Sequence, residues 1–166
     1  LLLTLPGGRR QGFGLHRASG LAARLAAAAS ARSALAPGTG LPDGSLATVD
    51  FHLQDLRRRL RAETPDLRGL GRRLAWAERW LLVLAKGRDP LARVRGRVVM
   101  AYRAPEDGSL QPYSLYVPHG SPGREGWPLV VMLHGMGGDH RQGLHQILGA
   151  WPAPGSPLSW EAFLQK

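Results

Sequence analysis

Cysteine is absent from this chain of 166 residues, which excludes disulfide bonds, catalysis by a thiolate and zinc sites built from cysteine. Long apolar runs are absent as well, since none approaches the roughly 18 residues that a membrane-spanning helix needs. The apolar start at residues 1–5 is too short for the core of a signal peptide, and no basic segment precedes it. Because position 1 is Leu, we expect that preceding sequence is missing, a secretion signal included.

Lysine is scarce, because Lys86 and Lys166 are the only lysines among 22 basic residues. With 12 acidic residues the formal net charge is +10. One interpretation is a basic surface that binds phosphate or acidic lipid. We favour a compositional bias towards Arg, Ala, Gly, Pro and Leu, because the arginines are spread along the chain. The 22 glycines and 13 prolines predict many loops.

Leucine spacing predicts a helical hairpin over residues 48–90. Its first helix is expected behind a cap at Thr48 or Asp50, with leucines at intervals of three or four residues. Its second helix is expected to start at residues 64–66, where Thr, Pro and Asp provide a hydroxyl cap, a first-position proline and an acidic residue. The apolar stripe of that helix consists of Leu67, Leu70, Leu74, Ala77, Leu81 and Leu84, widened by Trp76 and Trp80.

The apolar pattern changes from helical to alternating at Gly96. Residues 98–103 and 113–117 alternate around a turn at 105–108, which predicts a β-hairpin of two half-buried strands. Residues 129–133 (LVVML) are continuously apolar instead. That pattern predicts a strand buried on both faces, as in a parallel sheet covered by helices.

The apolar run leads directly into residues 134–138 (HGMGG). Acyl transfer creates a tetrahedral oxyanion, and a glycine-rich loop at the end of a strand can turn its amides towards that charge. The pattern therefore indicates one half of an oxyanion hole. An ordinary glycine turn is the plainer interpretation, and a phosphate loop is disfavoured because no Lys-Ser or Lys-Thr follows the glycines.

Four segments within residues 94–140 form a further pattern: 101–105 (AYRAP), 107–113 (DGSLQPY), 115–118 (LYVP) and 128–139 (PLVVMLHGMGGD). With these segments, residues 94–140 resemble the entry to esterase-type α/β-hydrolases, which include poly(3-hydroxybutyrate) depolymerase-like, feruloyl or acetyl-xylan esterase-like and prolyl-oligopeptidase-like proteins. The resemblance implies an α/β fold. We expect a partial α/β-hydrolase sheet, with an antiparallel hairpin and a first buried strand, preceded by a helical N-terminal region.

The same resemblance implies roles for the loop. The backbone N–H of Met136 would be the first oxyanion donor, and that of Gly137 the next. His134 would brace the loop by hydrogen bonding, together with Gly135 and Gly138, and would not be the catalytic base.

The rest of the expected catalytic site is missing from the sequence. The family needs a serine in a Gly-x-Ser-x-Gly elbow, and no serine here has glycine on both sides at that spacing; Ser121 comes nearest. His140 and His145 follow the loop too closely to be the catalytic histidine, so we expect surface or turn residues, and we expect Asp139 to cap a turn. Beyond Leu148 the resemblance fades, which indicates an N-terminal fragment.

We therefore predict a flexible segment at residues 1–47 with a marginal helix in its alanine-rich stretch at 21–36, a helical hairpin at 48–90 and the truncated start of a hydrolase domain at 94–166. The intact parent would be a serine hydrolase acting on a small or polymeric carboxylic ester, with a peptide as the less favoured substrate. No cofactor, metal, nucleic acid partner or membrane span is expected, and the chain alone is expected to be inactive. The resemblance, and nothing else, suggests a secreted or periplasmic protein.

A basic helical interaction module that binds an acidic partner is the alternative. It would use residues 48–90, where four arginines lie close together: Arg57, Arg58, Arg59 and Arg61. A solvated helix face is the plainer interpretation of this cluster.

Overall fold

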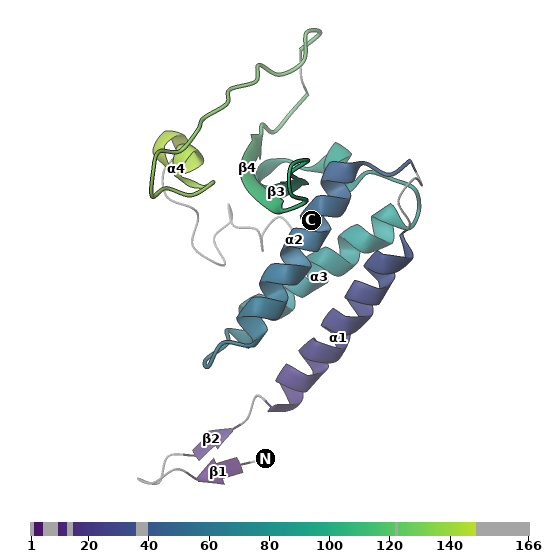
Figure 1. Cartoon of the computed structure of the whole chain (residues 1–166), viewed down its shortest axis with the longest axis vertical. Coiled ribbons are helices and arrows are strands. Elements are labelled where there is room, and N and C mark those ends of the chain that lie inside the picture. The colour runs from purple at the N-terminus through teal and green to yellow at the C-terminus, as the bar shows by residue number, and fades with distance from the viewer. Residues whose placement is uncertain (1, 5–9, 13–14, 36–39, 122, 149–166) are drawn as a thin grey trace. The chain divides into compact units, whose positions relative to one another are not determined.

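A computed structural model describes residues 2–4, 10–12, 15–35, 40–121 and 123–148, with side chains from Gly20 onward (Figure 1). The chain divides into two compact units, each considered by itself below. Unit 1 comprises Leu1–Leu41 and Val49–Arg88, and unit 2 comprises Pro42–Thr48 and Asp89–Lys166. None of the helices in the described ranges has the length and apolar character needed to cross a membrane.

Unit 1 is built on three helices that lie side by side (Figure 1). They are α1 (Leu15–Ala34), α2 (Asp43–Leu60, which belongs to unit 1 from Val49 onward) and α3 (Leu67–Leu84). Ion pairs join them two by two: Arg24–Glu78 (α1–α3, 2.6 Å), Arg32–Asp50 (α1–α2, 2.9 Å) and Arg73–Asp55 (α2–α3, 3.2 Å).

The predicted hairpin of α2 and α3 is confirmed. The His52 ring lies edge-on to Trp76 at 4.4 Å between centroids, and Asp55, one turn further along α2, pairs with Arg73, one turn earlier in α3. Because residues later in α2 contact residues earlier in α3, the two helices are antiparallel. Trp76 and Trp80 are both buried, as the leucine stripe predicts.

Both predicted helix starts are wrong in detail. Helix α2 begins at Asp43, five residues before the predicted cap Thr48, because the carbonyl of Pro42 already accepts the amides that open the helix. Helix α3 is capped by the Asp66 side chain, which accepts the Gly69 amide at 2.9 Å. Asp66 therefore takes the capping role that we predicted for Thr64.

Much of the segment predicted to be flexible is helical. Helix α1 covers twenty residues, more than the marginal helix expected near residues 21–36. It packs closely on α3, where the Leu21 side chain lies 3.6 Å from the position that a Cβ on Gly71 would occupy. Before it, β1 (Leu2–Thr4) and β2 (Arg10–Gly12) form an antiparallel pair.

Unit 2 contains the predicted hairpin, formed by β3 (Gly96–Arg103) and β4 (Leu110–Val117). The strands are antiparallel, with Met100 opposite Tyr113. The expectation of two half-buried strands is wrong for β3, because residues 98–101 are all buried and the strand is therefore covered on both faces. A short 3-10 helix, η1 (Pro90–Arg93), precedes β3.

The first turns of α2 belong to unit 2 through Thr48. Its hydroxyl donates to the Gly44 carbonyl at 2.7 Å and accepts the Ala101 amide at 3.0 Å. Nearby, the Ser45 hydroxyl donates to the Asp89 carboxylate at 2.7 Å, and that carboxylate also accepts the Leu91 amide at the start of η1. Thr48 and Ser45 are fully buried, so these hydroxyls satisfy polar groups in the core.

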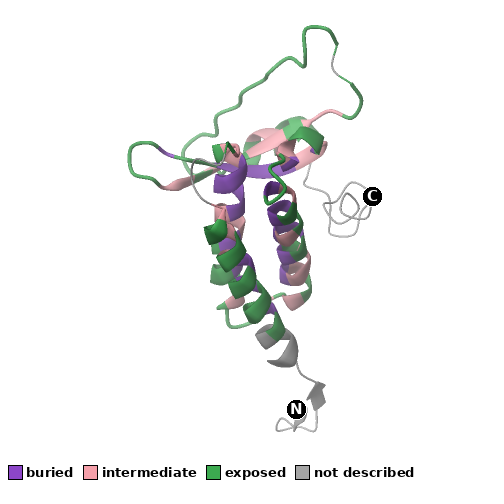
Figure 2. Cartoon of the chain, turned by 90° about the vertical axis from the view of Figure 1, so that its right-hand side faces the viewer, coloured by how far each residue is buried: buried purple, intermediate pink, exposed green. Residues whose placement is uncertain are grey.

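The buried strand predicted at residues 129–133 is not formed, so the fold prediction holds only in its coarser part, a mixture of helices and sheet. The segment has no strand hydrogen bonds, and its side chains are 45–91% exposed, drawn in green in Figure 2. A central strand needs neighbours for its N–H and C=O groups. In the described ranges of unit 2 the sheet has only β3 and β4, so the class that holds is a mixed one of helices with a two-stranded antiparallel sheet.

Candidate functional site

The predicted oxyanion loop forms a tight turn in unit 2. The amide of Gly138 donates to the carbonyl of Gly135 at 3.0 Å, which closes a turn with Met136 and Gly137 at its centre. Gly137 has a φ of +80°, whereas Met136 is not in the positive-φ region. This combination is that of a type II turn, in which the third residue is glycine because other side chains are strained there.

The turn leaves two amides free. Within the described residues, neither the Met136 amide nor the Gly137 amide has a hydrogen-bond partner in the chain. Met136 and Gly137 are both exposed. The two donors named from the resemblance are therefore available to an incoming acceptor.

His134 lies against the same loop. Its Nδ1 is 3.0 Å from the Gly135 carbonyl oxygen, which is the oxygen that also accepts the Gly138 amide. A protonated Nδ1 would donate to that carbonyl and hold the ring beside the turn. The contact is with an adjacent residue, and the bracing role of His134 stays a prediction.

Asp139 caps the segment that follows, as we predicted. Its carboxylate accepts the Arg141 amide at 2.9 Å, and its carbonyl accepts the Gln142 amide at the start of α4 (Gln142–Leu148). The hydrogen bond from the Arg141 amide is the main reason that the pKa of Asp139 is lowered, with further lowering by the charges of His140, Arg141 and His134. Asp139 is therefore ionised at neutral pH.

His140 is a site residue that the sequence analysis missed. His140 lies in the turn before α4, as expected, but its Nδ1 is also 2.9 Å from the Ser114 hydroxyl on β4, which we did not predict. Burial lowers the pKa of His140, the charges of Arg141 and His134 lower it further, and only the charge of Asp139 raises it. The imidazole is therefore neutral at pH 7. The alternation of β4 places Ser114 on one face of the strand, but nothing in the sequence pairs it with a residue 26 positions later.

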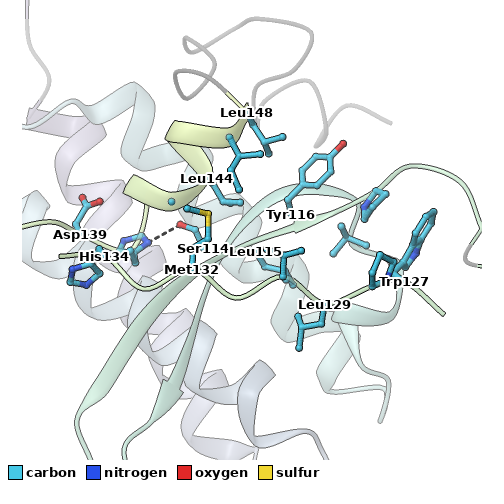
Figure 3. A pocket seen from close by; sticks show the side chains of 17 residues that line it. Ser114, Leu115, Tyr116, Trp127, Leu129, Met132, His134, Asp139, Leu144 and Leu148 are labelled. Carbon is cyan, nitrogen blue, oxygen red and sulfur yellow. Dashed lines mark hydrogen bonds between the residues drawn. The ribbon is translucent and has the colours of Figure 1, made fainter. Parts of the chain in front are cut away.

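Ser114 and His140 line a pocket of about 410 Å³ in unit 2. Its walls come from β4, from residues 127–134 and from residues 139–148. Figure 3 shows the polar side chains His134, Asp139 and Ser114 together, with Trp127 and Leu129 at a distance from them. The pocket therefore has a polar end beside the oxyanion loop and an apolar remainder.

Two arginines of the cluster on which the alternative function depends, Arg58 and Arg59, form ion pairs within unit 1. Arg58, Arg59 and Arg73 all donate to the Asp55 carboxylate. Desolvation raises the pKa of Asp55, but the hydrogen bonds and charges of Arg59 and Arg58 outweigh it, and the pKa is lowered. This network within the chain explains the presence of Arg58 and Arg59 without any binding partner. The binding of an acidic partner stays a prediction.

No protein-family model, no curated protein and no solved structure matches this chain.

Proposed function

We propose that this chain carries the oxyanion half of the active site of a serine hydrolase that acts on carboxylic esters, with peptides as the less favoured substrates. The observation that carries the proposal is the pair of free amides at Met136 and Gly137, held by a turn whose geometry requires glycine. The two donors belong to consecutive residues, and Gly137 adds no side chain of its own beside them.

The chemistry needs donors of this kind. When a serine attacks an ester carbonyl, the carbonyl oxygen becomes an oxyanion, and preorganised N–H groups stabilise it. Removing one such donor costs about 2.7–4 kcal/mol of transition-state stabilisation in hydrolases. In the family that the sequence resembles, one donor comes from this loop and the other from the residue after the nucleophile.

The nucleophile must come from sequence other than these 166 residues. No serine of the chain lies in a Gly-x-Ser-x-Gly elbow. Ser114 has a histidine partner, but it lies within β4, and in the described residues no carboxylate accepts a hydrogen bond from the His140 ring. The pair therefore lacks the elbow and the orienting acid of a triad.

The coding sequence that follows the codon for Lys166 tests the proposal. We expect it to encode a Gly-x-Ser-x-Gly elbow within one or two βα units, then an acidic residue and a histidine, in that order. An open reading frame without this elbow, or one that closes at once, would overturn the proposal.

A further inference from the structure

We propose that the pocket between β4, residues 127–134 and α4 binds the acyl part of an uncharged ester, with the carbonyl group at the Ser114–His140 end. The inference rests on the proposed function for the identity of the ligand as an ester. Binding itself is inferred from the size, the lining and the charge of the pocket.

Size and lining favour a small amphiphilic molecule. The volume of about 410 Å³ lies within the range of ligand pockets, which are largely apolar with a few polar groups that orient the ligand. The apolar wall is contributed by Leu115, Val117, Trp127, Val130, Leu144 and Ile147. An extended hydrocarbon chain matches this wall, since it needs no hydrogen-bond partner along its length.

The polar end selects the head group. In either tautomer of the neutral His140 ring, the pair keeps one donor for a carbonyl oxygen. The donor is Nε2–H when the Ser114 hydroxyl donates to Nδ1, and it is the Ser114 hydroxyl when Nδ1–H donates to Ser114. Asp139 lines the same end as a carboxylate, and it repels a second carboxylate. An uncharged ester is therefore favoured over the fatty acid anion that its hydrolysis would release.

Two neighbouring valines provide a matched pair of variants. Val130 lines the pocket and Val131 does not, yet their exposed fractions are almost equal, 74% and 71%. Substituting either one by Asp buries no charge in the core. The substitution Val130→Asp places a charge at the pocket wall, whereas Val131→Asp places the same charge beside it.

Calorimetric titration of the full chain with methyl butanoate, methyl hexanoate, methyl octanoate and sodium octanoate at pH 7.5 tests the inference. We expect affinity for the methyl esters to rise about fourfold per added methylene. Octanoate should bind at least tenfold more weakly than methyl octanoate. The Val130→Asp variant should lose at least tenfold in affinity for methyl octanoate, and the Val131→Asp variant should stay within twofold of the parent.

Three results would overturn the inference: no binding of methyl octanoate, equal binding of octanoate, or equal losses in the two valine variants, which would indicate unspecific adsorption to exposed apolar residues. These outcomes are separable from a failure of the proposed function. If esters bind but no elbow is encoded downstream, the proposed ester pocket stands and the proposed hydrolase function fails. If an elbow is encoded but esters do not bind, the hydrolase function stands and the ester pocket fails.

Discussion

The Ser114 hydroxyl and the Nδ1 of His140 lie 2.9 Å apart, which joins β4 to the segment between the oxyanion loop and α4. The two residues are 26 positions apart in the chain. Their hydrogen bond places the neutral imidazole at the polar end of the pocket, beside Asp139 and His134.

The pKa of His140 should therefore lie below the ordinary value of about 6.5 for histidine. The groups that act on it are Arg141 and His134, which lower its pKa, and Asp139, which raises it, with Ser114 as its hydrogen-bond partner. Titration of the ring protons by NMR should show this, and Arg141→Gln should raise the pKa. Arg124→Gln in the remote loop serves as the control and should leave it unchanged.

The same pKa fixes the sign of a stability effect. The folded chain binds fewer protons at His140 than the unfolded chain does, so stability from this group is complete above pH 6.5 and is lost as pH falls through the folded pKa. Replacing His140 by Gln should flatten this part of the stability curve. A His140 pKa above 6.5 would contradict a half-buried, neutral imidazole.

A fluorophosphonate probe should not label the chain. The reason is that Ser114 lies on a strand and lacks both the elbow and the acid that orients the histidine in a triad. Mass spectrometry after incubation with the probe is the measurement, and a Ser114→Ala variant is the control for any labelled peptide. Stoichiometric labelling that disappears in this variant would show that the chain has a nucleophile of its own.

Thr48→Val should destabilise the fold by about 1–3 kcal/mol, because it leaves the buried Ala101 amide without its acceptor. Thr48→Ser keeps the hydroxyl and should cost clearly less. Denaturant unfolding followed by circular dichroism measures both. Equal losses in the two variants would mean that the methyl group of Thr48, and not its hydroxyl, stabilises the first turns of α2.

Asp55→Asn should lower the free energy of unfolding by about 1–2 kcal/mol at pH 7, since the partners of this buried carboxylate are an exposed arginine, Arg58, and two half-exposed ones, Arg59 and Arg73. The pKa of Asp55 is lowered in the folded chain, so its contribution is present above the unfolded pKa of about 3.9 and is lost as pH falls through the folded pKa. The exposed Glu63→Gln is the matched control. The difference in free energy of unfolding between Asp55→Asn and Glu63→Gln should vanish at low pH, where the Asp55 carboxyl is protonated. A difference that does not change with pH would exclude ion pairing as its cause.

Local patterns in the sequence predicted local structure well. The leucine stripe identifies α3 and its buried tryptophans, and the alternation around residues 105–108 identifies the hairpin of β3 and β4. Helix starts were less predictable. Thr48 has the side chain of a cap, but it lies within α2, where it is buried and its hydroxyl accepts the amide of Ala101, a residue 53 positions later.

Features that depend on distant partners were not predictable. An apolar run such as residues 129–133 is typical of a buried strand, but it becomes one only if strands pair on both sides. The Ser114–His140 bond depends on the path of the loop between them, which no periodicity encodes. Asp139 was predictable as a cap because its partner Arg141 is two residues away.

The central claim is that the backbone amide of Met136, and not its side chain, stabilises an oxyanion. Met136 occupies the second position of a type II turn, where proline is well tolerated, so Met136→Pro removes the N–H and keeps the turn. The direct measurement is kcat for ester hydrolysis. It is made on a longer polypeptide that contains both these residues and the expected Gly-x-Ser-x-Gly elbow, and it is compared between Met136→Pro and Met136→Ala. We predict a loss of about 10²–10³-fold for the proline variant and less than about threefold for alanine. Equal kcat values in the two variants would contradict the claim.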